Sequence, residues 1–314
     1  MLRGHDTSVI FHNNLTIRGT TVWAYAGVVT NKRVPENCER LYYEIEISRE
    51  MRRLRNYDAL ILRSDPPIDN IMLNFLDSIK GDVFIMNDID GLRKAGNKIY
   101  PATLDDPGHT LIPVTHVSKD KDYLKSVIFE DESDRMIMKP LDASGGKGVI
   151  ILEKSAKKNI NSLLDFYINR DAKTNYVIIQ EYIEGAENGD TRVYMLNGNI
   201  LGAMRRVPAA DDMRSNIHAG GSVVFHELSE REKEICMSIG PKLIEDGLYF
   251  SGIDIIGDKI IEVNVTSPGG FDFMNLHLEV PLQKSLIDFV EKVVNEKVNL
   301  YSKKEIFRDN IQDV

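Results

Sequence analysis

The fold is decided by the stretch Gly252-Ile253-Asp254-Ile255-Ile256-Gly257-Asp258-Lys259-Ile260-Ile261-Glu262-Val263-Asn264-Val265. Apolar and polar residues alternate on both sides of a Gly-Asp pair. This pattern predicts a β-hairpin with one apolar face and one face that carries oxygen atoms. Glu262 and Asn264 are two residues apart, so they share a face of their strand.

The length of the turn decides whether Asp254 joins that face. A three-residue turn, Gly257–Lys259, places Asp254 opposite Glu262, whereas a two-residue Gly-Asp turn pairs Asp254 with Ile261 and turns Glu262 away. With the longer turn, Asp254, Glu262 and Asn264 converge. These hard ligands suit Mg²⁺, or Mn²⁺ as the alternative ion, together with substrate phosphates. The other interpretation is a hairpin whose polar face is simply solvated.

Composition describes an ordinary globular protein. The chain has 314 residues, enough for two or three domains, with 42% hydrophobic and 28% charged residues. A net charge of -9 argues against broad nucleic-acid binding, and the sequence contains no apolar run of transmembrane length. Cys38 and Cys236 lack metal-binding spacing and favour a reducing, cytoplasmic setting.

The first 90 residues show the pattern of a mixed α/β unit. Asp58–Arg63 is apolar enough to form a buried strand of a parallel sheet, which Pro66-Pro67 terminates. Other elements predicted here are strands at Ser8–Phe11, Leu15–Ile17 and Val83–Met86, and a helix at Asn70–Ile79. A loop at Arg93–Lys98 then opens the middle section.

Later segments alternate strands with helices. Strands are predicted at Met136–Lys139, Val149–Leu152, Tyr176–Glu181, Thr191–Leu196 and Ile200–Met204. Asn197-Gly198 is a strong hairpin signal between the last two. A helix is predicted to begin at the capping box Ser229/Glu232 and to end at Gly247, with Ile235, Ile239, Leu243 and Ile244 inward. A last helix is predicted from about Pro281 to Glu296, followed by a charged, peripheral tail from Tyr301.

A glycine-rich loop joins two of these strands, in the segment Lys139–Val149. The glycines of this loop are Gly145, Gly146 and Gly148. Glycine permits positive φ, so the backbone amides of the loop can face phosphate oxygens. Lys139 and Lys147 add positive charge. The residue order excludes a P-loop. A flexible glycine hairpin without a ligand is the competing interpretation.

Two further groups of polar residues have weaker patterns. Gln180–Ile183 ends a buried strand and can offer backbone groups to a planar base edge, although this segment by itself favours a strand end with a solvated Glu. An arginine-rich run suits carboxylates and phosphates, although any single arginine can lie on a solvated face. This run comprises Arg192, Arg205, Arg206, Arg214, Asn216 and His218.

Taken together, the segments resemble the prokaryotic glutathione synthetase family. The matching stretches follow in order over nearly the whole chain. They are Leu62–Asp69, Lys139–Asp142 with its Gly-Gly, Gly189–Val193, Arg206–Pro208, Arg214–Asn216, Ala219–Gly221, Gly252–Asp258 and Glu262–Pro268. A single such motif is weak, whereas the ordered set is strong.

The resemblance implies an α/β chain with the ATP-grasp fold and an N-terminal parallel-sheet pre-ATP-grasp domain. The expected domains are 1–90 for the substrate domain, 91–175 for the lid, 176–300 for the C-terminal part with the metal site, and 301–314 for a tail. The family has a further strand and helix ahead of the point where this chain begins, so the N-terminal domain is expected to be shortened.

The resemblance also implies roles for individual residues. The ATP-binding residues are Lys98, Lys139, Gly145, Gly146, Lys147, Gly148, Gln180, Glu181, Tyr182, Ile183 and Asn216. The metal ligands are Asp254, Glu262 and Asn264. The catalytic residues are Arg192, Arg206 and Arg214, and the peptide substrate is expected near Asp65, Arg192, Arg214 and Ser267.

The implied reaction joins γ-glutamylcysteine to glycine through an acylphosphate formed from ATP. Arg and Lys side chains with Mg²⁺ balance charge, and no protein nucleophile is needed. The family also suggests a homo-oligomer. Two departures leave the substrate open: Pro208–Asp212 replaces a more glycine-rich stretch, and Pro268–Phe271 stands where family members carry an Arg-Glu pair. Another ATP-grasp carboxylate–amine ligase, or a nucleotide-binding protein without catalysis, is the alternative.

Overall fold

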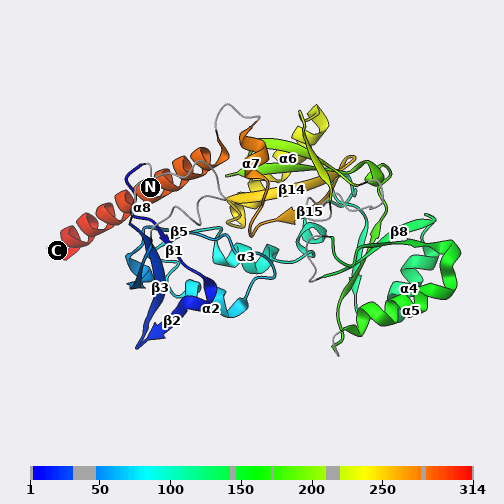
Figure 1. Cartoon of the computed structure of the whole chain (residues 1–314), viewed down its shortest axis with the longest axis horizontal. Helices are drawn as coiled ribbons and strands as arrows, with labels where there is room; N and C mark the ends of the chain where they lie inside the picture. Colours follow the sequence, from blue (N-terminus) through cyan, green and yellow to red (C-terminus); the bar gives the residue numbers. More distant parts are fainter. Residues whose placement is uncertain are drawn as a thin grey trace. The chain divides into compact units, whose positions relative to one another are not determined.

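The computed structural model describes residues 3–30, 47–141, 146–170, 173–209, 220–276 and 281–312. The chain divides into two compact units. Unit 1 consists of Met1–Ser64, Ile68–Ile89 and Val290–Val314, and unit 2 consists of Asp65–Pro67 and Asp90–Phe289. Figure 1 labels the elements along the chain. None of the helices in the described ranges combines the length and apolar character needed to cross a membrane.

Unit 1 contains an antiparallel sheet centred on β3 (Thr21–Val29). β4 (Ile47–Arg53) pairs along one edge of β3, and β1 (Ser8–Val9) and β2 (Leu15–Arg18) pair with β3 as well. The strands predicted near Ser8 and Leu15 are confirmed. β3 and β4 were not predicted from the sequence. β4 is largely charged, and its pairing with the apolar β3 explains why it forms a strand.

Unit 1 also contains the predicted parallel pair. β5 (Ala59–Ile61) and β6 (Phe84–Met86) lie parallel and are connected through α2 (Asn70–Asp77), which confirms the parallel sheet expected of the N-terminal domain. The side chain of Asp69 caps α2 by accepting the Ile71 N–H at 2.8 Å. The predicted end of the last helix is wrong, because α8 runs over Leu282–Gln312, through the segment expected to be a tail.

α3 (Ile89–Ala95) leads into the main part of unit 2, and the first half of the predicted Arg93–Lys98 loop is helical. A four-stranded antiparallel sheet follows in the order β7-β10-β8-β9. These strands are β7 (Thr115–Ser118), β8 (Arg135–Pro140), β9 (Ile150–Glu153) and β10 (Val177–Glu181). Figure 1 shows α4 (Lys121–Glu130) and α5 (Lys157–Ile168) against this sheet, where they share a core with Met138 and Ile179.

The second sheet of unit 2 has five strands in the order β13-β12-β11-β14-β15. Their bounds are β11 (Asp190–Leu196), β12 (Asn199–Val207), β13 (Ser222–Phe225), β14 (Phe250–Ile256) and β15 (Lys259–Asn264). The predicted Asn197-Gly198 turn joins β11 to β12 with positive φ at both residues.

α6 (Glu230–Glu245) packs on one face of this sheet. The predicted capping box is present: Ser229 accepts the Glu232 N–H and Glu232 accepts the Ser229 N–H. Ile235 and Leu243 are buried as predicted, but Ile244 is 42% exposed, so its inward assignment is wrong. The opposite face of the sheet carries the polar residues described next, and α7 (Phe271–Asn275) follows β15 in the chain.

Candidate functional site

The hairpin of β14 and β15 has a register that combines both turn alternatives. Ile256 pairs with Lys259, so the turn holds two residues and the predicted three-residue turn is wrong. A bulge then shifts the pairing, and Asp254 lies opposite Glu262, with Gly252 opposite Asn264. The extra residue is Ile261, which restores the shared face that the turn alone would have lost.

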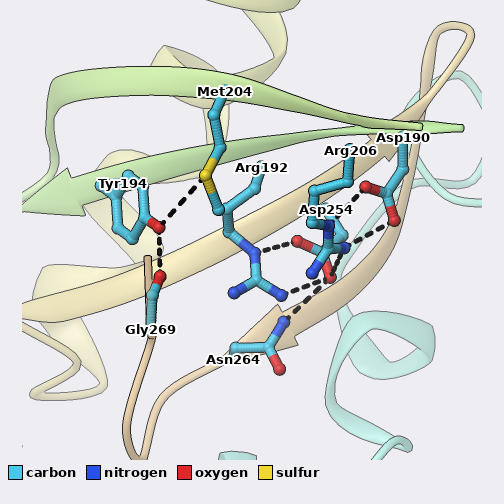
Figure 2. A network of polar contacts seen from close by, with 8 residues as sticks. All are labelled: Asp190, Arg192, Tyr194, Met204, Arg206, Asp254, Asn264 and Gly269. Carbon is cyan, nitrogen blue, oxygen red and sulfur yellow. Dashed lines mark hydrogen bonds and ion pairs between the residues drawn. The ribbon is translucent and has the colours of Figure 1, made fainter. Parts of the chain in front are cut away.

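Asp254 forms the centre of a buried charge network (Figure 2). It is 1% exposed. Arg192 Nε donates to Oδ1 of Asp254, and Arg192 Nη2 donates to Oδ2 at 2.7 Å. Arg206 Nη2 lies 2.8 Å from the same Oδ2. Burial raises the pKa of Asp254, but the two guanidinium groups outweigh it and hold that pKa below its usual range.

A second carboxylate, Asp190, balances the second arginine. Arg206 donates through Nε and Nη2 to the two oxygens of Asp190, at 2.6 and 2.5 Å. Strand register explains both pairs, because Asp190 lies opposite Arg206 and Arg192 lies opposite Asp254. Two guanidinium groups and two carboxylates thus neutralise one another, as buried charges require.

The same face offers a limited set of metal ligands. Asn264 Nδ2 donates to Asp254 Oδ2 at 3.2 Å, so the amide oxygen of Asn264 points away from Asp254 (Figure 2). Among the described residues, no group of three or more His, Cys, Asp or Glu side chains could hold a metal ion. Both Asp254 oxygens accept hydrogen bonds from arginine, whereas the amide oxygen of Asn264 points away from them, and carboxylate and amide oxygens such as those of Glu262 and Asn264 are ligand types that suit Mg²⁺.

Lys139 lies within electrostatic reach of this face. It is 8% exposed and donates to Gln180 Oε1 at 2.8 Å. Its pKa is lowered to about 8, chiefly by burial, while Glu262 raises it and Lys98 lowers it further. Lys139 therefore interacts electrostatically with both Glu262 and Lys98.

The side chains at the end of β10 serve internal contacts. Gln180 Nε2 donates to Thr115 Oγ1 at 2.8 Å, and Glu181 Oε2 accepts the Val114 N–H at 3.0 Å. The Tyr182 ring lies under the Arg135 guanidinium, 4.3 Å from its centroid. The main chain of Gln180 and Glu181 also lies within the sheet, where Gln180 pairs with both β7 and β8 and the Glu181 N–H donates to the Val114 carbonyl at 2.9 Å.

The glycine loop is described from Gly146 onward. Gly146 and Gly148 both adopt φ of +70°, the conformation for which glycine is favoured. Tyr167 Oη donates to the Gly148 carbonyl at 2.8 Å, and Lys147 is exposed. Gly145, Arg214 and Asn216, which the sequence also assigns to the site, lie outside the described residues.

Ser267 is half-buried in the segment that leaves β15. Tyr194 Oη donates to the Gly269 carbonyl in this segment and lies 3.7 Å from the sulfur of Met204 (Figure 2). Asp65 is exposed and belongs to unit 2. Tyr194 therefore holds the segment of Ser267 against the polar face of the sheet.

Sequence reasoning missed Asp190, Thr115 and Tyr194. Asp190, Arg192 and Tyr194 alternate along β11 and so share one face. That spacing was a usable signal for Asp190 and Tyr194, because Arg192 was already a candidate. No local sequence signal pointed to Thr115, because its partner Gln180 is far away in the sequence.

Comparisons with known proteins agree with this geometry. Residues 97–277 match the model of the prokaryotic glutathione synthetase ATP-grasp domain, and residues 1–93 match that family's N-terminal domain. A glutathione synthetase of Gloeobacter violaceus is 34% identical over 308 residues, covering 91% of this chain and 92% of the relative. A glutathione synthetase of Bradyrhizobium diazoefficiens is 36% identical over 271 residues, covering 85% of this chain and 82% of the relative.

Solved structures share the fold at lower identity. D-cycloserine synthetase DcsG superposes with a TM-score of 0.59 at 15% identity, covering 77% of this chain and 85% of that one. ATP-grasp ligase PsnB, complexed with minimal precursor, Mg and ADP, superposes with a TM-score of 0.53 at 18% identity. The match covers 76% of this chain and 78% of that one. These likenesses establish the ATP-grasp fold. Together with the family models and the relatives, they show that this chain belongs to the prokaryotic glutathione synthetase family of ATP-grasp ligases.

Proposed function

We propose that this chain ligates glycine to γ-glutamylcysteine in an ATP-dependent reaction that forms glutathione. The observation that supports the proposal is the buried arginine–carboxylate network opposite Glu262, a carboxylate that interacts electrostatically with Lys139, in a chain of this family. A carboxylate oxygen of the peptide attacks the γ-phosphorus of ATP, and ADP leaves. The glycine nitrogen then attacks the acyl carbon, and phosphate leaves as the nitrogen loses its proton.

Lysines and backbone amides bind the phosphates in this proposal. Lys139 and Lys98 supply positive charge, and the Gly145–Gly148 loop with Lys147 covers the phosphates. Burial of Lys139 strengthens its attraction to an anion, because little water screens it. The main chain of Gln180–Ile183 faces the adenine.

Glu262 and the amide oxygen of Asn264 would hold Mg²⁺ or Mn²⁺. When bound there, the ion would supply positive charge that balances the phosphates. Asp254 contributes mainly by positioning its neighbours. It accepts a hydrogen bond from Asn264, which orients that amide, and it forms ion pairs with both arginines.

The arginines stabilise the acylphosphate and the tetrahedral intermediate. Nη1 of Arg192 and of Arg206 takes part in none of the contacts with Asp254 and Asp190 (Figure 2). Because the other two nitrogens of each guanidinium are fixed by carboxylates, these donors are preorganised for developing negative charge. Arg214, Asn216, Asp65 and Ser267 are assigned to the peptide and acylphosphate side of the site.

The domain roles follow from this assignment. ATP is expected between the 91–175 lid and the 176–300 part, and the 1–90 domain is expected to take part in binding the peptide. A homo-oligomer and a cytoplasmic location remain predictions, for which sedimentation and cell fractionation are the tests.

ADP release tests the function directly. Mg-ATP, γ-glutamylcysteine and glycine are supplied together and with each omitted in turn, and glutathione is quantified. Release that requires all three, and that is lost in Glu262→Ala, supports the proposal. Turnover only with other carboxylate–amine pairs would replace it with a different ligase, and ATP binding without turnover would indicate a non-catalytic nucleotide-binding protein.

A further inference from the structure

The bulge that places Glu262 lies on an edge strand. β15 is the last strand of its sheet, so its outer edge has no strand partner within that sheet. The two-residue turn by itself would pair Asp254 with Ile261, and only the bulge brings Glu262 opposite Asp254. The position of this carboxylate therefore depends on whatever holds the bulge in place.

A short loop attaches to β15 at the bulge. The Ile260 N–H, next to the bulged Ile261, donates to the Leu111 carbonyl at 2.7 Å. Lys259 Nζ donates to the His109 carbonyl in the same loop. Two consecutive residues of β15 are thus bound to this loop immediately before the register shifts.

One carboxylate organises the loop from inside. Oδ1 of Asp106 accepts from the N–H and the hydroxyl of Thr110, both at 3.0 Å. Its Oδ2 accepts the Leu111 and Ile112 N–H groups, at 2.7 and 2.8 Å. The Asp106 carbonyl also accepts the His109 N–H at 2.9 Å, which closes a turn. Removing this side chain leaves four donors without their acceptor and frees the Leu111 carbonyl from its fixed position.

We infer that Asp106 is a positioning residue for the metal site: its loop fixes the bulge of β15 and thereby the location of Glu262. This inference rests on the function proposed above, because it takes Glu262 as a metal ligand. Asp106 itself touches neither substrate nor metal in this assignment. Partners that orient metal ligands from outside typically affect metal affinity about 10- to 100-fold.

The test compares Asp106→Ala with Asp105→Ala in the full-length protein. Asp105 is exposed, adjacent and of the same charge, but it makes none of these four contacts. Mn²⁺ affinity is measured by electron paramagnetic resonance in the presence of ADP, ADP affinity is measured without metal, and hydrogen exchange is followed at the Ile260 amide. We expect Asp106→Ala to bind Mn²⁺ about 10- to 100-fold more weakly, with faster exchange at Ile260 and unchanged metal-free ADP affinity.

Each result decides the inference. Wild-type Mn²⁺ affinity in Asp106→Ala, with faster exchange at Ile260, would overturn it, since the loop would then hold the strand without positioning the ligand. Should Asp106→Ala fail to fold, Asp106→Asn keeps one acceptor oxygen, and a loss of Mn²⁺ affinity smaller than that expected for alanine supports the inference, whereas no loss overturns it. If the wild-type protein bound no Mn²⁺ with ADP, the proposed function would fail as well, which distinguishes that case from failure of Asp106 alone.

Discussion

Asp254 and Glu262 lie opposite each other, yet their surroundings differ sharply. Asp254 is buried and compensates two arginines, whereas Glu262 is only partly buried. The sequence assigns both as metal ligands, and removal of a residue with that role alone would leave the fold intact. The burial of Asp254 revises that expectation, because a guanidinium left without its counter-ion inside a protein is costly.

We predict that Asp254→Ala destabilises the protein by about 3–5 kcal/mol, since it leaves Arg192 and Arg206 under-compensated. Glu262→Ala is expected to change stability by no more than about 0.5 kcal/mol while abolishing turnover. Thermal unfolding and ADP release are measured for both variants. Equal melting temperatures for the two would contradict the structural role of Asp254, and residual turnover close to wild type in Glu262→Ala would contradict the metal assignment.

Lys139 gives a prediction about pH. Its pKa of about 8 lies below the ordinary value of 10.5, so the folded protein binds fewer protons than the unfolded chain between those two pH values. Its burial therefore destabilises the fold below pH 8, and this penalty disappears as the pH rises from about 8 toward 10.5. Bound phosphates favour the charged form and raise the pKa again.

Binding of ADP should consequently take up as much as one proton near pH 8.5, and close to none near pH 6.5, where Lys139 is already charged. Calorimetry in buffers with different ionisation enthalpies measures the uptake. Lys139→Arg is the matched variant, because it keeps the charge but does not titrate in this range. An uptake that persists unchanged in Lys139→Arg would show that another group is responsible.

The segment after β15 is fixed by contacts between elements. Gly270 adopts φ of +94°, and a Cβ placed on it would lie 2.6 Å from Tyr194 Oη and 2.7 Å from Met204 Cε. The neighbouring Gly269 has nothing within 4 Å of an added Cβ. These two glycines, both in the stretch that departs from the family pattern, thus differ in what they permit.

We predict that Gly270→Ala costs about 1–3 kcal/mol and displaces the segment of Ser267, because the backbone conformation and the available space both oppose a side chain. Gly269→Ala is expected to be close to neutral. Melting temperatures and the KM for γ-glutamylcysteine measure the two effects. A Gly270→Ala protein with wild-type stability and KM would show that Tyr194 does not fix this segment.

At the scale of the whole molecule, the residues assigned to ATP fall within unit 2 where the structure describes them. A ligand stabilises the cooperative unit that unfolds together with its binding site. At 100 times its Kd, it adds about 2.7 kcal/mol.

Mg-ADP is therefore expected to slow hydrogen exchange within residues 90–289 and to leave the exchange of β1–β4 in unit 1 unchanged. Lys139→Met should remove most of this protection. Hydrogen exchange with mass spectrometry measures both. Protection that appeared equally in β1–β4 would indicate that unit 1 and unit 2 respond to the nucleotide together.

Local patterns in the sequence determined much of this architecture. The alternation in residues 252–265, the Asn197-Gly198 turn and the Ser229/Glu232 capping box depend on neighbouring residues, so each specifies its element without the rest of the chain. The ordered motifs likewise sufficed to indicate the family. Lys139, Glu262 and Asn264 were predicted as site residues from such patterns; Asn264 donates to Asp254, which lies opposite Glu262, and Glu262 interacts electrostatically with Lys139.

Tertiary structure decided what depends on distant partners. The bulge at Ile261 is held beside a loop some 150 residues earlier in the chain, and β4 becomes a strand because β3 pairs with it. The oxygens of Asp254 accept hydrogen bonds from Arg192 and Arg206, on two other strands, so a residue predicted as a metal ligand also acts as a buried counter-ion. The physical reason is that register and charge compensation depend on which segments meet in space, and residue type and local spacing do not contain that information.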